Sequence, residues 1–434
     1  MEYIPILVLI ISFLGLLSIG TPVAWSIAIS ALLTMLVSIP FLPAATTLAQ
    51  RMGAGLDSFA LLAIPFFILA GNLMNKGGMA HRLIAFAKTL VGALPGGLAL
   101  INITAAMLMG AIAGSAMASA SAMGSILGPE MEKEGYSKEF GAAVNITSAT
   151  TGLVIPPSNI LIVYSLASGG VSIAALFLAG YIPGILTGLF LMIVAMVWAK
   201  RKGYVSKNKK GNISISQIGK TFVNAFPSLL LLFIVIGGIV AGVFTATEAS
   251  AIAVLYSLVL GVLYKEISFK NLPSILLDSS LTTAIVMLLI AASISMSWAM
   301  SYENIPQATS DILLGISNNK IIILIMINVI LLVVGIFMDM TPAVLIFTPI
   351  FLPVVTKLGI DPVHFGVIMI LNLCIGLCTP PVGSVLFVGV GVAKTSIQKV
   401  IKPLIPLFLA MIVALFLITY IPQLTLWLPS LFDL

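Results

Sequence analysis

The chain has 434 residues, of which 60% are hydrophobic and only 8% are charged. Globular domains carry about 25% charged residues, so this chain has too few to cover a surface that faces water. A membrane crossing takes about 20 apolar residues, and the composition allows about a dozen crossings at most. A soluble enzyme, a nucleic-acid-binding protein and a receptor with a single anchor are therefore excluded. The chain is predicted to be a polytopic membrane protein.

The net charge of +6 comes from basic residues between the apolar stretches, where membrane topology explains them. Cys374 and Cys378 share one apolar stretch, and the two histidines are His81 and His364. These residues favour neither a disulfide framework nor a zinc site. The sequence has no paired catalytic constellation and no phosphate-binding loop, so we expect neither an enzyme nor ATP hydrolysis. The first 20 residues carry Glu2 and no basic residue, which indicates a membrane span rather than a signal peptide.

Apolar stretches follow one another along the whole chain, separated by short polar or glycine-rich connections. They lie near 4–20, 22–42, 58–75, 97–113, 119–129, 140–168, 172–199, 221–243, 246–264, 281–300, 321–338, 343–356, 363–392 and 400–421. Two of them are interrupted by the pairs Pro156-Pro157 and Pro380-Pro381. Four others form two half-length pairs, split by small or polar residues at 114–119 and 339–342. Such pairs are too short to cross twice, which predicts re-entrant hairpins.

An internal repeat appears when the sequence is shifted by 224 residues, because helix breakers then coincide. The shift places Thr21 on Thr245, Gly114-Ser115 on Met338-Asp339, Pro129 on Pro353, Gly135 on Gly359, and Pro156-Pro157 on Pro380-Pro381. We treat the polar stretches 76–95 and 302–319 as helices that lie along the membrane interface. Each half then has five crossings and one hairpin, and the odd number makes the halves inverted.

Counting basic residues gives the orientation. With the linker KRKGYVSKNKK in the cytoplasm, 17 of the 20 lysines and arginines lie inside and only Arg51, Lys320 and Lys357 lie outside. If 76–95 and 302–319 crossed the membrane, the halves would be parallel and five of the inner basic residues would move outside. The inverted arrangement therefore fits better, and it predicts that both termini are outside.

The predicted organisation is two inverted repeats joined by a basic cytoplasmic linker. The first repeat, 1–200, has scaffold helices at 1–75, an arm helix at 76–95, a hairpin at 97–131, a broken helix at 140–168 and a helix at 172–199. The linker is 201–220. The second repeat, 221–434, has a scaffold at 221–300, an arm at 302–319, a hairpin at 321–357, a broken helix at 363–392 and a helix at 400–421.

Inverted repeats with interrupted helices are typical of secondary transporters, whose sites lie where the helices break. Lipid cannot satisfy the freed carbonyl and amide groups, so each break must line a cavity or bind something polar. Carbonyl oxygens suit a hard cation such as sodium, and helix N-termini suit a carboxylate. In the first half the tip has Gly114, Ser115 and Ser119, and hydroxyls surround the break at 145–159. Close helix packing and an ordinary proline kink are the alternatives there.

In the second half, Asp339 is an acidic residue deep inside an apolar run, with Thr341, Gly376 and Thr379 as candidate co-ligands. A charge at that depth costs about 2.5–3.5 kcal/mol on insertion scales, which indicates a function. The alternative is a helix cap. Three other residues fit either surface or functional roles: Glu248 could cap a helix, while Arg51 and His364 are interpreted as outer surface charges that could instead meet an anion.

Seven segments in order resemble the large membrane subunit of tripartite ATP-independent periplasmic (TRAP) transporters, the DctM-like M subunit. They are GTPVAWSIA, IPFFILAGNLM, GSAMASASAMG, TGLVIPPSN, GVFTATEASA, MDMTPAVLIFTPIFLPV and GIDPVHFGVIMILNLCIGLCTPPVG. The resemblance implies a fold of the ion-transporter superfamily, in which a unit formed by the hairpins and broken helices moves like an elevator. It also implies sodium symport, with two or more Na⁺ ions and no organic cofactor.

Carried onto this sequence, the resemblance implies sodium ligands at Gly114, Ser115, Gly152, Val154, Pro156, Gly335, Asp339, Thr341, Gly376 and Thr379. By position, Ser119, Pro157, Ser158, Asn159, Pro381 and Gly383 would face the substrate, an organic acid such as sialic acid or a C4-dicarboxylate. The expected partners are a separate four-helix Q-type subunit, a periplasmic P-type binding protein and the lipid of the bacterial inner membrane, with no nucleic acid. A stand-alone sodium- or proton-coupled carboxylate transporter remains the alternative.

Overall fold

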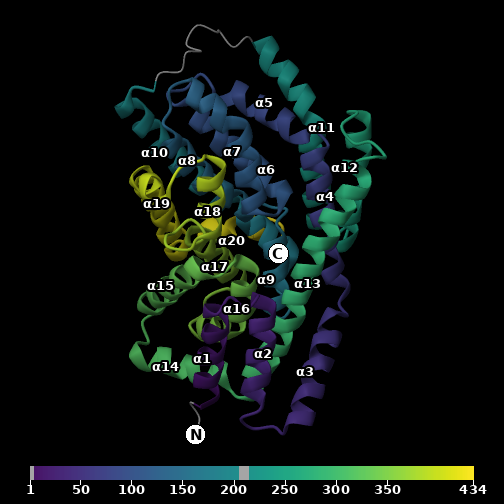
Figure 1. Ribbon diagram of the computed structural model, residues 1–434, viewed down its shortest axis with the longest axis vertical. Coiled ribbons are helices and arrows are strands. Elements are labelled where there is room, and N and C mark those ends of the chain that lie inside the picture. Colours follow the sequence, from purple (N-terminus) through teal and green to yellow (C-terminus); the bar gives the residue numbers. More distant parts are fainter. Residues whose placement is uncertain (1–3, 205–214) are drawn as a thin grey trace.

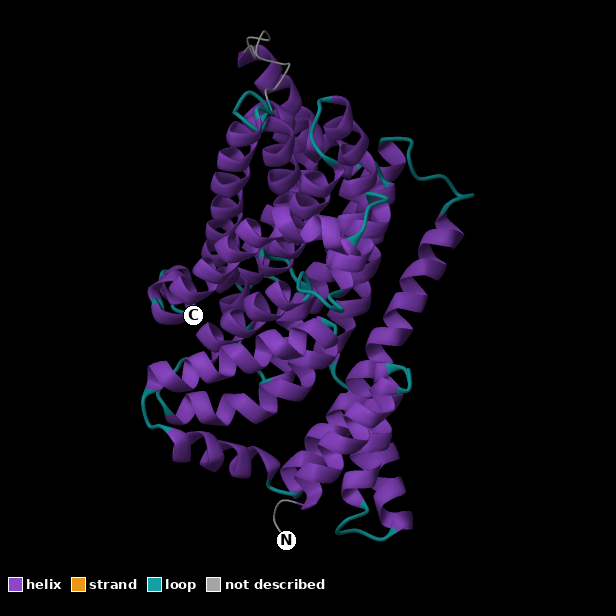
Figure 2. Cartoon of the chain, turned by 60° about the vertical axis from the view of Figure 1, so that its left-hand side comes forward, coloured by secondary structure: helices purple, strands orange, loops and turns teal. Residues whose placement is uncertain are grey.

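The computed structural model describes residues 4–204 and 215–434. All regular structure in these residues is helical, and the helices pack into one elongated body (Figures 1 and 2). The all-helical fold predicted from the sequence is therefore confirmed. The predicted linker 201–220 is described only in part, because 205–214, with Lys207, Lys209 and Lys210, lies outside the described residues.

Of the helices in the first half, α10 is the longest. In chain order they are α1 (Ile4–Ser18), α2 (Val23–Met35), α3 (Phe41–Leu56), the 3₁₀ turn η1 (Phe59–Leu62), α4 (Ala63–Lys76), α5 (Met79–Val91), α6 (Gly97–Ala113), α7 (Ala116–Lys133), α8 (Lys138–Val154), α9 (Asn159–Ala167) and α10 (Ile173–Lys202).

The second half repeats this order with a single long helix, α13, where the first half has α3, η1 and α4. Its helices are α11 (Ile215–Val240), α12 (Ala246–Leu263), α13 (Leu272–Tyr302), α14 (Ile305–Ile316), α15 (Lys320–Phe337), α16 (Met340–Lys357), α17 (Pro362–Gly376), α18 (Ser384–Val392), α19 (Ile397–Tyr420) and α20 (Gln423–Ser430).

Eight helices of the described chain are long and apolar enough to cross a membrane, by length and composition. A ninth crossing results if α8 and α9, which meet at a bend of 53°, count as one broken span. The helices α1 and α2 are shorter apolar helices. These lengths show a multi-pass membrane protein.

Apart from α5 and α14, which match the predicted arm helices, two helices of the described chain lie almost wholly outside the predicted apolar stretches. The first is α3, which carries Gln50 and Arg51 and is therefore more polar than a lipid-facing span. The second is α20, which has eight residues and contains Pro429. Hydropathy alone selects long apolar runs, so it passes over a half-polar helix such as α3 even where that helix packs against α13.

The helices of the two halves pack in exchanged pairs. The 224-residue shift relates α2 to α12 and α4 to α13. Helix α4 packs against α12, and α13 packs against α2. In the same way α7 packs against α18, and α16 packs against α9. Each half therefore completes the packing of the other, and neither half forms a separate core.

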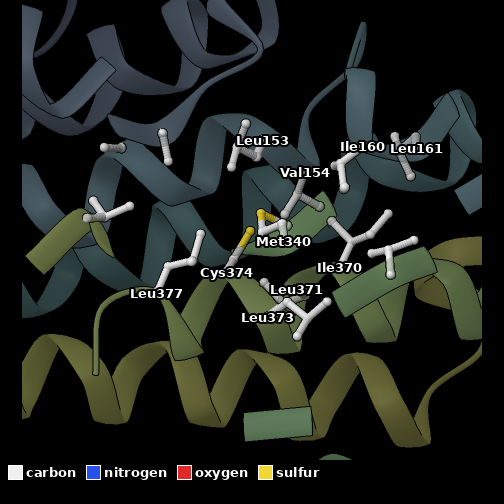
Figure 3. Close-up of a cluster of buried hydrophobic side chains, with 14 of the residues drawn as sticks. Leu153, Val154, Ile160, Leu161, Met340, Ile370, Leu371, Leu373, Cys374 and Leu377 are labelled. Carbon is white, nitrogen blue, oxygen red and sulfur yellow. The ribbon is translucent and has the colours of Figure 1, made fainter. Parts of the chain in front are cut away.

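The two helices α8 and α17 form the centre of the molecule. All residues of α8 from Ala142 to Val154 are buried, and so are all residues of α17 from His364 to Gly376. Figure 3 shows where these helices meet, with Leu153 of α8, Ile160 of α9, Met340 of α16 and Cys374 of α17 in one apolar cluster. The ends of α8 and α17 are thus fixed by packing on every side.

Glycine contacts hold each hairpin against its broken helix. A Cβ atom added to Gly110 of α6 would lie 2.2 Å from the Cα atom of Gly152 in α8. In the second half, a Cβ atom on Gly376 of α17 would lie 2.5 Å from the Cα atom of Gly335 in α15. Backbones approach this closely only where both residues lack a side chain. The same contact therefore occurs once in each half, beside the break.

Two residues with alternative interpretations have structural roles. Glu248 forms a capping box at the start of α12, where its Oε2 atom accepts a hydrogen bond of 2.8 Å from the Thr245 backbone N–H. The interpretation of His364 as an outer surface charge is wrong, because only 2% of the residue is exposed. Its Nδ1 atom lies 2.7 Å from Thr425 Oγ1, so the ring joins α17 to α20.

We expect Gly110→Ala to destabilise the protein by about 1–3 kcal/mol, because the added methyl group overpacks the contact with Gly152. The midpoint of thermal unfolding of the purified protein should fall by several degrees. Gly237→Ala in α11 is the control, because its Cβ atom would meet nothing within 4 Å. An unchanged midpoint in Gly110→Ala would contradict the close approach of α6 and α8.

Candidate functional site

A cavity of about 340 Å³ lies between the two hairpin tips. Gly114 and Ser115 line it from the first tip, and Asp339 and Thr341 line it from the second. Asn159, at the start of α9, lies between them. The cavity therefore brings together five of the predicted site residues from both halves of the chain.

The opposite wall of the cavity comes from α4 and α13. It is mostly apolar, with Ile64 and Ile68 on α4 and Ile285, Val286 and Leu289 on α13. Its polar members are Asn72 and Thr282. The Asn72 amide donates a hydrogen bond of 2.8 Å to Ser279 Oγ, which ties α4 to α13. The cavity thus has four polar side chains on the hairpin side, those of Ser115, Asn159, Asp339 and Thr341, and a mostly apolar wall on the other.

The first tip depends on Gly114. Its φ of +61° lies in the left-handed region that glycine adopts without strain, and it ends α6. A Cβ atom there would lie 2.6 Å from Asn159 Nδ2, so the amide side chain of Asn159 covers the tip. Ser115 then starts α7, and its hydroxyl oxygen accepts a hydrogen bond of 3.3 Å from the Ala118 N–H.

Asp339 takes the position of Ser115 in the second tip. It precedes α16 with an extended backbone, but its side chain does not make the capping hydrogen bond that Ser115 makes. The residue is exposed, and it lines the central cavity. Its carboxylate therefore borders that cavity without capping α16 in the way that Ser115 caps α7.

Four helices begin at this cavity. Their first turns supply lining residues: Ala116 of α7, Asn159 of α9, Met340 of α16 and Val385 of α18. The N-terminus of a helix carries unpaired N–H groups and about half a positive charge. Four such ends around one cavity produce a field that favours an anion, and the helix ends are fixed before any ligand arrives.

The first break leaves backbone carbonyls without helical partners. Pro156 and Pro157 have no N–H, so the carbonyls of Gly152 and Leu153 cannot receive the usual helical hydrogen bonds. The Ser158 hydroxyl donates to the Leu153 carbonyl instead. The Thr147, Ser148, Thr150 and Thr151 hydroxyls donate to oxygens of α6 or α8 itself. Of the two carbonyls that the prolines leave without a helical donor, that of Leu153 is satisfied by Ser158, so the Gly152 carbonyl is a candidate oxygen at this break.

The second break is closed differently. Pro380 and Pro381 again remove two N–H groups, but the Gly376 carbonyl accepts a hydrogen bond of 2.9 Å from the Thr379 N–H. The Thr379 hydroxyl donates over 2.8 Å to the Ile375 carbonyl. A Cβ atom on Gly383 would lie 2.6 Å from the Leu377 carbonyl oxygen and 2.8 Å from that of Thr379. Carbonyl oxygens therefore surround Gly383.

The remaining predicted residues lie behind the cavity surface. Gly152, Gly335 and Gly376 are in the glycine contacts, and Val154, Pro156 and Ser158 are buried inside the first break. Ser119 is 1% exposed, and its hydroxyl has no hydrogen-bond partner among the described residues. Pro157, Thr379, Pro381 and Gly383 are in the loops of the breaks, and none of these residues lines the central cavity.

The scaffold wall and one glycine were not predicted from the sequence. Asn72 lies within the segment IPFFILAGNLM, whose resemblance was noted without a role for any residue. Thr282 is one of two adjacent threonines in a long apolar helix, and Gly110 lies four residues before Gly114, where the tip turn begins. Only the position of Gly110, one turn before the tip, could have suggested its contact with the broken helix.

A multi-pass helical protein whose hairpin tips and broken helices surround one cavity has the architecture of a membrane transporter. The family described as "Tripartite ATP-independent periplasmic transporter, DctM component" matches residues 10–424. The chain belongs to this family.

Individual relatives cover nearly the whole chain. "Uncharacterized protein YgiK" of Salmonella typhimurium is 57% identical, over 99% of each chain. "Sialic acid TRAP transporter large permease protein SiaM" of Vibrio cholerae is 39% identical, over 98% of each chain. "C4-dicarboxylate TRAP transporter large permease protein DctM" of Rhodobacter capsulatus is 37% identical, over 96% of this chain and 97% of that protein.

The fold also resembles that of a solved transporter with little sequence similarity. The YdaH transporter of Alcanivorax borkumensis superposes with a TM-score of 0.64, covering 88% of this chain and 89% of that one, at 14% identity. The likeness concerns the fold alone. It agrees with the multi-pass helical architecture described above.

We expect Gly383→Ala to lower transport about tenfold, because the new methyl group would push against two backbone carbonyls that cannot move independently. Gly391→Ala in α18 is a matched control, since its Cβ atom would have no neighbour within 4 Å. The measurement is solute uptake into proteoliposomes at equal amounts of inserted protein. Equal uptake by the two variants would show that the close packing of Gly383 is unimportant.

Proposed function

We propose that this chain is the large membrane subunit of a TRAP transporter that imports an organic acid together with sodium ions. The observation that carries this proposal is the cavity at which four helix N-termini and the Asp339 carboxylate meet. The helix ends favour an anionic substrate. The carboxylate favours a cation nearby, and a site that attracts both fits symport of an acid with sodium.

Sodium ions would bind in the two tip-and-break regions. In the first half the proposed ligands are provided by Gly114, Ser115, Gly152, Val154 and Pro156. In the second half they are provided by Gly335, Asp339, Thr341, Gly376 and Thr379. Backbone carbonyls and hydroxyls are the oxygen ligands that hard cations accept. The carbonyl of Gly152, which the prolines leave without its helical donor, and the carboxylate of Asp339, which does not cap α16, are the two groups that best suit such an ion.

Substrate would bind in the cavity beside Asn159, with Ser119, Ser158, Pro157, Pro381 and Gly383 as neighbours in the tips and breaks. The substrate class is an organic acid, because relatives are named for sialic acid and for C4-dicarboxylates. Each positive charge carried inward gains about 2.3 kcal/mol per 100 mV of membrane potential. Sodium binding would thus supply energy for uptake without ATP.

Movement of the hairpins and broken helices against α4 and α13 would carry the substrate across. The wall formed by Ile64, Ile68, Ile285, Val286 and Leu289 is apolar, so few polar contacts would have to break when the opposite surface slides past it. This property supports an elevator mechanism. The moving unit would comprise α6–α9 and α15–α18, and the predicted repeat boundaries at 1–200 and 221–434 are part of the same proposal.

The proposed assembly has three parts. A small four-helix membrane subunit and a periplasmic binding protein would join this chain in the bacterial inner membrane, with both termini of the chain on the periplasmic side. A stand-alone sodium- or proton-coupled carboxylate transporter is the second candidate. Reconstitution distinguishes them: uptake that requires the binding protein favours the tripartite form, and uptake by the single chain favours the alternative.

We expect Asp339→Asn to reduce sodium-stimulated uptake about tenfold or more, because the variant loses a charged ligand of the cation. Uptake of labelled succinate, isethionate and N-acetylneuraminate into proteoliposomes containing the complete complex is measured with sodium and with potassium outside. Asp433→Asn, in the exposed C-terminal tail, is the control. Uptake that is equally fast in potassium would overturn sodium coupling, and a normal sodium response in Asp339→Asn would remove this residue from the site.

A further inference from the structure

A second cavity, which none of the predicted site residues lines, lies beside the central one. It has a volume of about 390 Å³ and includes Arg51 of α3 and Ser293, Ser297, Trp298 and Ser301 of α13. We call it the upper cavity, where upper means away from the basic linker; Figure 1 shows the molecule the other way up, with α3 at the bottom. The helices α9, α13 and α16 line both cavities. On each helix, the residues that line the upper cavity come later in the sequence than those that line the central cavity.

The order of residues along these helices places the upper cavity farther from the basic linker. On α13 the central cavity is lined by residues up to Leu289, and the upper cavity by residues from Ile290 to Ser301. On α16, Leu345 follows Met340 and Thr341 in the direction of Lys357. With the linker in the cytoplasm, the upper cavity lies on the periplasmic side of the proposed substrate site.

Arg51 gives the upper cavity a positive charge. Its guanidinium carbon lies 5.2 Å from the centre of the Trp298 ring, a cation–π contact that holds the side chain toward α13. Helix α3 is itself held there, because a Cβ atom on Gly55 would lie 2.7 Å from the Ile294 side chain. Arg51 forms no ion pair with the carboxylates of the described residues.

Three serines, each four residues apart, lead inward from Arg51 along one face of α13. Ser301 is exposed, Ser297 is half-buried and Ser293 is only 2% exposed. The Ser293 hydroxyl lines the cavity and has no hydrogen-bond partner within the described part of the chain. A buried hydroxyl without a partner is costly, and a ligand with acceptor oxygens would satisfy it.

We infer that the upper cavity is an entry site for the anionic group of the substrate, with Arg51 binding the anion and the serines guiding it toward the central cavity. The inference rests on the proposed function. A guanidinium that lines a cavity concentrates anions there and accelerates their capture. The central cavity attracts the anion by helix ends, so the two cavities form successive anion sites along α13.

Cysteine labelling tests the upper cavity without requiring transport. Both native cysteines are completely buried, so they should not react with the reagents. Ser297→Cys introduces a thiol at a half-buried position of the upper cavity. The complete complex, with cysteine-free partner subunits, is labelled in right-side-out vesicles with anionic sulfonatoethyl or cationic trimethylammonioethyl methanethiosulfonate. After correction for the intrinsic reactivity of each reagent, we expect the anionic reagent to react about tenfold faster. Adding Arg51→Gln should remove this preference, and Arg51→Lys should retain most of it.

Succinate, isethionate and N-acetylneuraminate are then added as competitors. At least one should slow the labelling of Ser297→Cys, and its protection should be lost with Arg51→Gln. Ser125→Cys is the matched control, because Ser125 lines a cavity beside Glu132 and Lys138 near the linker, where reagents added outside should not react. Equal rates for both reagents, or no protection by any of the three acids, would overturn the inference.

Uptake kinetics separate this inference from the proposed function. Arg51→Gln should raise the KM for the transported acid about tenfold, with sodium dependence unchanged, and Arg51→Lys should restore part of the affinity. Normal KM in Arg51→Gln, with sodium-driven uptake intact, would reject the entry site and leave the proposed function standing. Charge-selective labelling and protection by an acid, without any uptake, would support the entry site and reject the proposed transport function. If excess binding protein alone restored Arg51→Gln, Arg51 would contact that protein, and the entry site would be rejected.

Discussion

The structure depends on how broken helices satisfy their backbone groups far from water. Lipid cannot pair with a free carbonyl or amide, so helix ends at the depth of the hydrocarbon must face protein or a polar cavity. Here the breaks after α8 and α17 and the turns before α7 and α16 are gathered around one cavity. Positive helix N-termini and negative helix C-termini therefore meet in a small volume, which is the condition for binding an anion and a cation together.

Close backbone contact keeps these ends in place. Gly110 meets Gly152, and Gly335 meets Gly376, so each hairpin is fixed to the broken helix that follows it. The exchanged packing of α7 on α18 and of α16 on α9 then joins the two halves. A rigid unit of this kind can present its polar surface to α4 and α13 without exposing its own breaks to lipid.

The sequence predicts the breaks well because their signals are local. Pro156-Pro157 and Pro380-Pro381 remove N–H groups wherever the chain folds, and the polar turns at Ser115 and Asp339 stand out in apolar surroundings. The wall of α4 and α13 could not be predicted in this way. Ile64 or Val286 has the same hydrophobicity whether it faces lipid, another helix or a cavity, so only tertiary packing assigns its role. The same reason explains why the buried position of His364 was missed.

The two cavities differ in how they hold charge, and this difference suits successive steps. Arg51 carries a full charge on an exposed side chain. It attracts an anion over a distance, but water and salt weaken its hold on the anion once it is bound. The helix ends of the central cavity carry partial charges whose positions are fixed by the fold. An anion would therefore move from a site of strong attraction to one of closer fit. Sodium beside Asp339 would add a full positive charge at the second site only, which makes the inward step dependent on the cation.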